Sequence, residues 1–176
     1  MAIIAKEPES KFSPAPEGLF QGVCADVVDL GTEVNKFNGG LQDKIRIVWQ
    51  LEEVNKETGR PYEISQKYTN SLHEKATLRH HLEAWRGKKF TQDELMGFDL
   101  EKLIGANCQI QVVHNVKEGG KTYSNVQAVV PAAKNAMKIR VTDGYVRTKD
   151  RKPATTNGTG EPHAPADQIS DDDLPF

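Results

Sequence analysis

Apolar and polar residues alternate along residues 44–51. Every second residue there is large and apolar: Ile45, Ile47, Trp49 and Leu51. A period of two is that of a β-strand with one buried face, so this segment is predicted to be a strand. The intervening residues are mostly charged or polar: Lys44, Arg46, Val48 and Gln50. The second face of this strand is therefore predicted to be a basic, partly polar surface.

Further runs rich in β-branched, aromatic and small apolar residues have the composition of strands. They cover residues 19–37 (with a bend at Gly31), 62–69, 107–116 and 121–130. Turn-forming segments separate neighbouring runs, because Asn and Gly tolerate the backbone angles of tight turns. These turns lie at residues 38–40, 55–60 and 117–120. The chain is therefore predicted to be mainly β.

The apolar period becomes helical between the third and fourth predicted strands. Three large residues there are spaced as on one helix face, and a glycine follows as the predicted stop: Leu78, Leu82, Trp85 and Gly87. Two segments match the capping box that opens a helix: Ser71–Glu74 and Thr91–Glu94. A further helical turn is expected at residues 99–103. Residues 132–147 have no clear period, and whether they form an extra strand or an oligomer contact is left open.

The order of these elements is three strands, a helical insert and two strands. This is the order of the OB-fold, a five-stranded barrel whose strand face and loops bind oligonucleotides. The insert, from Ser71 to Gly105, is about 35 residues long, which exceeds a typical connection. The predicted fold is an OB-fold-like five-stranded barrel with a helical insert between strands 3 and 4.

Charge and composition divide the chain into four parts. Residues 1–17 are predicted to be an extended lead-in, 18–147 the folded domain, 148–170 a disordered linker and 171–176 a separate tip. All 23 Lys and Arg residues lie at or before Lys152, whereas five acidic residues follow it. The net charge of -2 therefore consists of about +3 in the body and -5 in the tail. This split favours a body that meets polyanions.

The tip combines three carboxylates with an apolar residue, a proline and a terminal aromatic ring: Asp171, Asp172, Asp173, Leu174, Pro175 and Phe176. A solubilising acidic terminus has no need of Leu174 and Phe176. The tip resembles that of bacterial and phage single-stranded DNA-binding proteins, where an Asp-Asp-Asp-Ile-Pro-Phe type of ending docks into replication and repair enzymes. Leu174 stands where isoleucine is commoner.

The resemblance implies a protein that binds and protects single-stranded DNA with little sequence specificity during phage replication, recombination or repair. It also implies that replication or recombination proteins bind the tip. The Phe176 ring would fill an apolar pocket on such a partner, and its carboxylate would pair with a basic side chain. Neither catalysis nor a cofactor is expected. Two alternatives stay open: a strand-annealing accessory protein, and an adaptor that engages host replication enzymes without binding DNA.

Candidate DNA contacts are basic or aromatic residues of the strands and loops that flank an OB-fold groove. Bases are expected to stack on Phe37, Tyr68 and Tyr123. Phosphates are expected to contact Lys36, Lys44, Arg46 and Lys121. The alternative for each residue is a core or rim aromatic, or a solvated lysine.

Other chemistry is not indicated. Cys24 and Cys108 lack the spacing of a zinc or redox motif, and Thr77 stands where a second zinc ligand should follow His73. No secretory signal and no apolar run of membrane-spanning length are present, so a cytoplasmic protein is expected, in the bacterial host if phage-encoded. The sequence does not indicate the oligomeric state.

Overall fold

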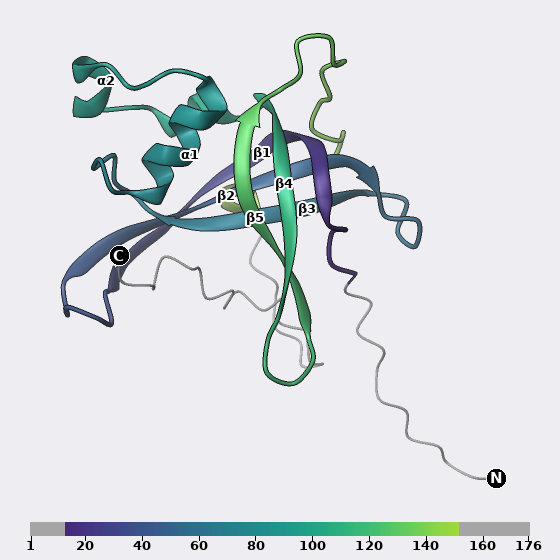
Figure 1. Ribbon diagram of the computed structural model, residues 1–176, viewed down its shortest axis with the longest axis horizontal. Helices are drawn as coiled ribbons and strands as arrows, with labels where there is room; N and C mark the ends of the chain where they lie inside the picture. The colour runs from purple at the N-terminus through teal and green to yellow at the C-terminus, as the bar shows by residue number, and fades with distance from the viewer. Residues whose placement is uncertain (1–12, 152–176) are drawn as a thin grey trace.

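The computed structural model describes residues 13–151, in which five antiparallel strands form one sheet (Figure 1). The strand order is β3-β2-β1-β4-β5. The bounds are β1 (Gly18–Val34), β2 (Leu41–Val54), β3 (Pro61–Thr69), β4 (Asn107–Val116) and β5 (Thr122–Pro131). The prediction of a mainly β fold is confirmed. β3 and β5, the two edges, lie near each other, but no ladder pairs them within residues 13–151.

The alternation along β2 sets the inner face of the sheet. The four large apolar residues that alternate along the middle of this strand are each 4% exposed or less: Ile45, Ile47, Trp49 and Leu51. The outer face differs from the prediction of a solvated surface, because Lys44 and Gln50 are also buried. The ammonium group of Lys44 donates a hydrogen bond to Thr69 Oγ1 (2.8 Å), on the neighbouring strand β3.

The segment between β3 and β4 contains α1 (Thr77–Arg86), α2 (Gln92–Met96) and the 3₁₀ helix η1 (Leu100–Leu103). As predicted, α1 buries Leu78, Leu82 and Trp85 and ends at Gly87, whose φ of 69° is in the left-handed region. The indole rings of Trp85 and Trp49 lie 6.0 Å apart. The helix therefore closes one end of the core through its apolar face.

Only one of the two predicted capping boxes forms. The Thr91 hydroxyl accepts a hydrogen bond from the backbone N–H of Glu94. In return, the Glu94 carboxylate accepts a hydrogen bond from the backbone N–H of Thr91. The prediction for Ser71 is wrong, because α1 begins at Thr77 and its N-cap is Ala76. The Ser71 hydroxyl instead accepts a hydrogen bond from the N–H two residues ahead, in a local turn that competes with helix formation.

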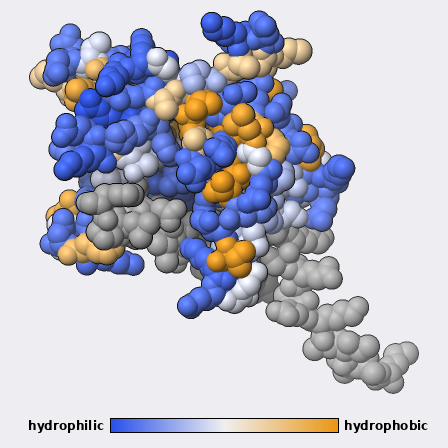
Figure 2. Space-filling view, in the orientation of Figure 1, coloured by the Kyte–Doolittle hydropathy of each residue, from blue (hydrophilic) through white to orange (hydrophobic). Residues whose placement is uncertain are grey.

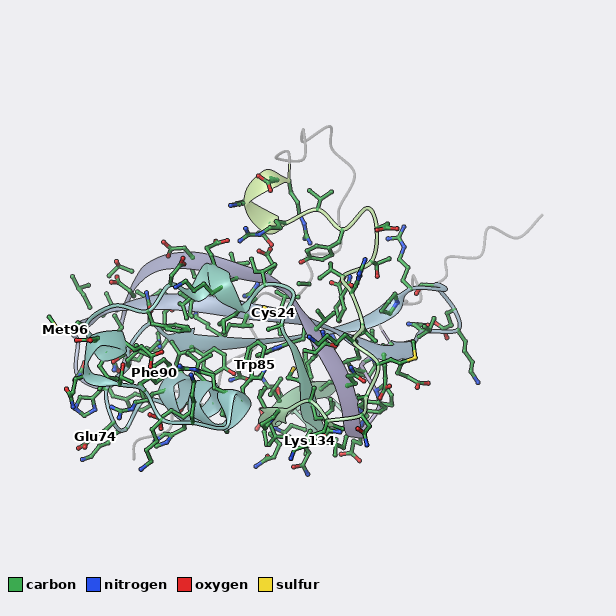
Figure 3. The ribbon with its side chains drawn as sticks, turned by 90° about the horizontal axis from the view of Figure 1, so that it is seen from above. Cys24, Glu74, Trp85, Phe90, Met96 and Lys134 are labelled. Carbon is green, nitrogen blue, oxygen red and sulfur yellow. The ribbon has the colours of Figure 1, made fainter. Side chains whose placement is uncertain are left out.

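Residues 137–151, which we call the strap, form no strand and cross the sheet on the side opposite α1 (Figure 3). Side chains of three strands hold the strap by hydrogen bonds: Gln21 to Met137 O, Asn107 to the backbone of Ile139, Gln50 to Thr142, and Asp26 to Arg147 and Thr148. The strap ends in a 3₁₀ helix, η2 (Thr148–Asp150). Residues 148–151, which the sequence places at the start of the linker, thus belong to the strap.

Removing the buried part of Leu82 should destabilise the fold, since this side chain is 0% exposed and joins α1 to the sheet. We expect Leu82→Ala to lower the free energy of unfolding by about 2–5 kcal/mol in urea titrations. Leu19→Ala, at a residue that is 59% exposed, is the matched control and should change it by less than about 0.5 kcal/mol. Equal effects of the two substitutions would contradict this packing.

Candidate nucleic-acid interface

The turn between β1 and β2 presents Lys36 and Phe37 to solvent. Asn35 fixes this turn, since its side-chain oxygen accepts from the Phe37 N–H (2.8 Å) and its own N–H donates to Gly40 O (2.7 Å). Gly39, with φ of 69°, takes the left-handed position. The Phe37 ring is 61% exposed, which is unusual for so large an apolar side chain. The turn therefore holds an aromatic ring and a cation outside the core.

The turn between β4 and β5 carries a second cluster of cations beside an aromatic ring. The Lys117 N–H donates to Lys121 O (3.0 Å), and the Lys117 ammonium lies 5.1 Å from the centre of the Tyr123 ring. Lys121 is exposed and Tyr123 is half-buried. Figure 1 shows the ends of both hairpins projecting on the lower side of the body. Four of the predicted DNA contacts thus lie on the two hairpins.

The outer face of β2 and β3 holds the remaining predicted cations. Arg46 lies opposite Lys67 in the strand register and is partly exposed. Lys67 forms an ion pair with Glu33 (2.7 Å), so its charge is already compensated within the sheet. Lys44 is buried against Thr69. Lys44 is therefore poorly placed for the phosphate contact expected of it.

Tyr68 lies on the inner face and cannot serve as the stacking platform that was predicted. Its side chain is 0% exposed, its hydroxyl is 2.7 Å from His81 Nδ1, and the two rings meet edge to face at 5.5 Å. Burial, with a smaller effect of His80, lowers the pKa of His81 and favours its neutral ring. This pair belongs to the core, so the prediction for Tyr68 is wrong.

A charged network attaches the strap to β1 and η1. Asp26 is 1% exposed and accepts hydrogen bonds from Arg147 Nε (2.9 Å) and from the Thr148 N–H (2.7 Å). Arg147 also donates to both carboxylate oxygens of Glu101 (2.7 and 2.9 Å). Burial opposes ionisation of Asp26, but the bonds from Thr148 and Arg147 outweigh it and lower the pKa. Arg147 likewise lowers the pKa of Glu101.

The strap also brings residues to the outer face that the sequence analysis missed. Tyr145 lies between two hollows, and Arg151 and Arg46 line the smaller of them. The signal in the sequence was a tyrosine followed by four cations within seven residues: Arg147, Lys149, Arg151 and Lys152. The cluster lies across the end of the segment without a clear period and the start of the predicted linker, where no strand pattern ties its charge to the sheet.

The described residues offer no evident centre for metal or thiol chemistry. No group of three or more His, Cys, Asp or Glu residues within 13–151 is arranged to hold a metal ion. Cys24, which lies in the middle of the molecule in Figure 3, is 0% exposed, and burial raises the pKa of its thiol to about 12. Burial also raises the pKa of Cys108. Both thiols are therefore protonated and shielded at neutral pH.

The visible surface is mostly hydrophilic. In Figure 2 apolar side chains lie in separate spots along β4 and β5 and form no single continuous patch on that face. No helix among residues 13–151 is long and apolar enough to cross a bilayer. A wide apolar docking surface is therefore not visible from this side.

Comparison with known proteins assigns no family, since neither a family model nor a curated protein matches this sequence. The six residues of the tip, Asp171, Asp172, Asp173, Leu174, Pro175 and Phe176, lie outside the described residues. Their predicted role in binding a partner stays a prediction.

Replacing Arg147 should expose the energetic importance of the network. Asp26 would keep its buried charge but lose its cationic partner, so we expect Arg147→Ala to cost about 3 kcal/mol of unfolding free energy at pH 7. The lowered pKa of Asp26 means that its stabilising effect is present above its unfolded pKa of about 3.9 and is lost as pH falls through the folded value. The difference in unfolding free energy between Arg147→Ala and wild type should therefore be smaller at about pH 3 than at pH 7.

The matched control is Arg140→Ala, since Arg140 is an exposed arginine of the same strap. Urea unfolding of wild type, Arg147→Ala and Arg140→Ala at pH 7 and at about pH 3 measures the change in unfolding free energy. A stability loss for Arg147→Ala that does not change between pH 7 and about pH 3 would show that the ion pair contributes nothing.

Proposed function

We propose that this protein binds single-stranded DNA without strong sequence preference and that its fold is OB-like. The strand order supports the fold, because β1 pairs with both β2 and β4 and a helical segment separates β3 from β4. An OB-fold is a partly open five-stranded Greek-key barrel, which agrees with a single sheet whose edges approach each other without pairing. Its ligands lie on the strand 2–3 face, between the loops of strands 1–2 and 4–5.

The observation that carries the proposal is the pairing of an aromatic ring with lysine at both of these loops. Phe37 and Lys36 occupy the β1–β2 turn, while Tyr123 with Lys117 and Lys121 occupies the β4–β5 hairpin. Single strands are bound by cations that follow the backbone and by rings on which bases stack. An exposed phenylalanine at a hairpin tip has little use in the protein's own core.

The arrangement favours binding with little sequence preference. Stacking accepts any base because every base has a flat π-face, and lysine contacts phosphates that carry no sequence information. Such a protein would coat transient single strands during replication or recombination. Within this proposal, the acidic tip recruits replication or recombination enzymes, and Phe176 is the residue that enters the partner's pocket.

Binding should be measured by fluorescence anisotropy with labelled single-stranded oligonucleotides of several lengths at two salt concentrations. We expect the affinity to fall as salt rises, because cations are released from each contacted phosphate. Phe37→Ala should weaken binding by about 1–3 kcal/mol if its ring carries one base.

Lys75→Ala is a suitable control for Lys36→Ala, since Lys75 is an exposed lysine of the segment that leads into α1 and belongs to neither hairpin turn. The slope of the logarithm of affinity against the logarithm of salt concentration should become about 0.7 shallower in Lys36→Ala. Lys75→Ala should leave this slope unchanged. Absence of any binding by the wild-type protein at low salt would overturn the proposed function and favour an adaptor that engages other proteins only.

Deletion of residues 171–176 tests the role of the tip. Since the deletion removes three carboxylates from a chain with a basic body, we expect DNA affinity at low salt to stay the same or to rise. Binding of replication or recombination enzymes in a pull-down should be lost. The control is Phe176→Ala, which keeps the acidic charge. Retention of all partners by the truncated chain would refute recruitment through the tip.

A further inference from the structure

The strap and the outer face of β2–β3 enclose two adjoining hollows. The smaller, about 170 Å³, is lined mainly by Arg46, Ser65, Thr148 and Arg151. The larger, about 270 Å³, is lined mainly by Gln50, Arg60, Pro61, Thr142 and Asp143. Tyr145 and Glu63 line both, so the hollows adjoin. Each is smaller than the site of a typical drug-sized ligand, which suits one flat or compact group per hollow.

The two hollows differ in charge. Two guanidinium groups, those of Arg46 and Arg151, line the smaller hollow together with the single carboxylate of Glu63, which leaves a net positive charge. The hydroxyl groups of Ser65 and Thr148 line it as well. Cations and hydroxyl groups are typical ligands of a phosphate. In the larger hollow, carboxylates of Glu63 and Asp143 accompany the single cation of Arg60. A second phosphate is therefore disfavoured there, whereas an uncharged ring with hydrogen-bonding edges is not.

Tyr145 lies where the two hollows meet. The guanidinium group of Arg151 lies 5.8 Å from the centre of the Tyr145 ring, and its Nε donates to Val146 O (3.1 Å). The Tyr145 hydroxyl is buried, and its interaction with the Arg151 side chain falls short of ordinary hydrogen-bond geometry. A buried hydroxyl with a poor partner is costly, and a bound ligand can supply a better bond.

The strap is fixed firmly enough to act as a wall. Thr142 donates to Gln50 Oε1 from both its N–H (2.8 Å) and its hydroxyl (3.0 Å), on one side of Tyr145. Arg147 and Thr148 bind Asp26 on the other side. Tyr145 is therefore held between two attachment points, which reduces the freedom it would lose on binding a ligand.

We propose that the strap forms the second wall of the DNA groove and that one nucleotide of a single strand binds beneath it. Its phosphate lies between Arg46 and Arg151, and its base enters the larger hollow against the Tyr145 ring. This inference rests on the proposed function and adds to it a site that neither hairpin supplies. Binding along the strand thus continues from the hairpin turns onto the strap.

The test compares three strap variants with wild type in anisotropy titrations of a labelled oligo(dT) strand over a range of salt. Arg151→Ala should lower the magnitude of the logarithmic salt slope by about 0.7, the value for one phosphate contact on a single strand. Tyr145→Ala should weaken binding about 5- to 150-fold with an unchanged slope. Lys138→Ala, at an exposed lysine of the same strap, is the control and should behave as wild type.

Photocrosslinking gives a readout that a purely structural role would not affect. An oligonucleotide carrying 5-iododeoxyuridine should crosslink to the peptide that contains Tyr145, and excess unlabelled oligonucleotide should suppress the product. Thermal unfolding checks that each variant is folded. If Tyr145→Ala is not folded, the binding of Arg151→Ala tests the proposal instead. Arg151 is exposed, so its replacement should leave the fold intact.

The outcomes separate the two proposals. Failure of the wild-type protein to bind oligo(dT) would overturn both. Wild-type binding with unchanged affinity and salt slope in Arg151→Ala and Tyr145→Ala, and with crosslinks confined to the hairpins, would overturn the strap site alone. Weaker binding of both variants, with the crosslink at Tyr145, would support it.

Discussion

The buried carboxylate of Asp26 is the constraint on which the outer face depends. The register of β1 shifts between Cys24 and Asp26, which is a bulge, and a bulge re-aims the side chains that follow it. Cys24 stays in the core while Asp26 meets Arg147. A carboxylate that is buried without partners would be very unfavourable, so the sheet determines where the strap must lie.

Local signals predicted much of the fold because they act over a few residues. The alternation along β2, the Thr91 capping box and the stop at Gly87 each depend on neighbours in sequence. The strap had no such signal. Its bonds join residues far apart, such as Thr142 and Gln50, which are 92 positions apart. No local period can reveal a contact of that kind.

The errors at the candidate site have physical causes of the same sort. The period of two already placed Tyr68 on the same side as Ile64, and both are buried. The face that buries Ile64 therefore keeps Tyr68 out of the groove. Lys44 and Lys67 lie on the outer face, yet Thr69 and Glu33 engage them. A cation in the sequence is thus a weaker guide to a polyanion site than a cation whose partners are known.

The strap ends at Arg151, beside Arg46 and Ser65, and residues 152–170 of the predicted linker follow it. The 19 residues of 152–170 can span at most about 65 Å when fully extended. Under the proposed function, an enzyme held by Phe176 is therefore tethered to the very face that holds the strand. Under the same proposal, a short tether would raise the local concentration of that enzyme toward the millimolar range. Linker length, as well as tip affinity, would then govern how readily a coated strand meets the next enzyme.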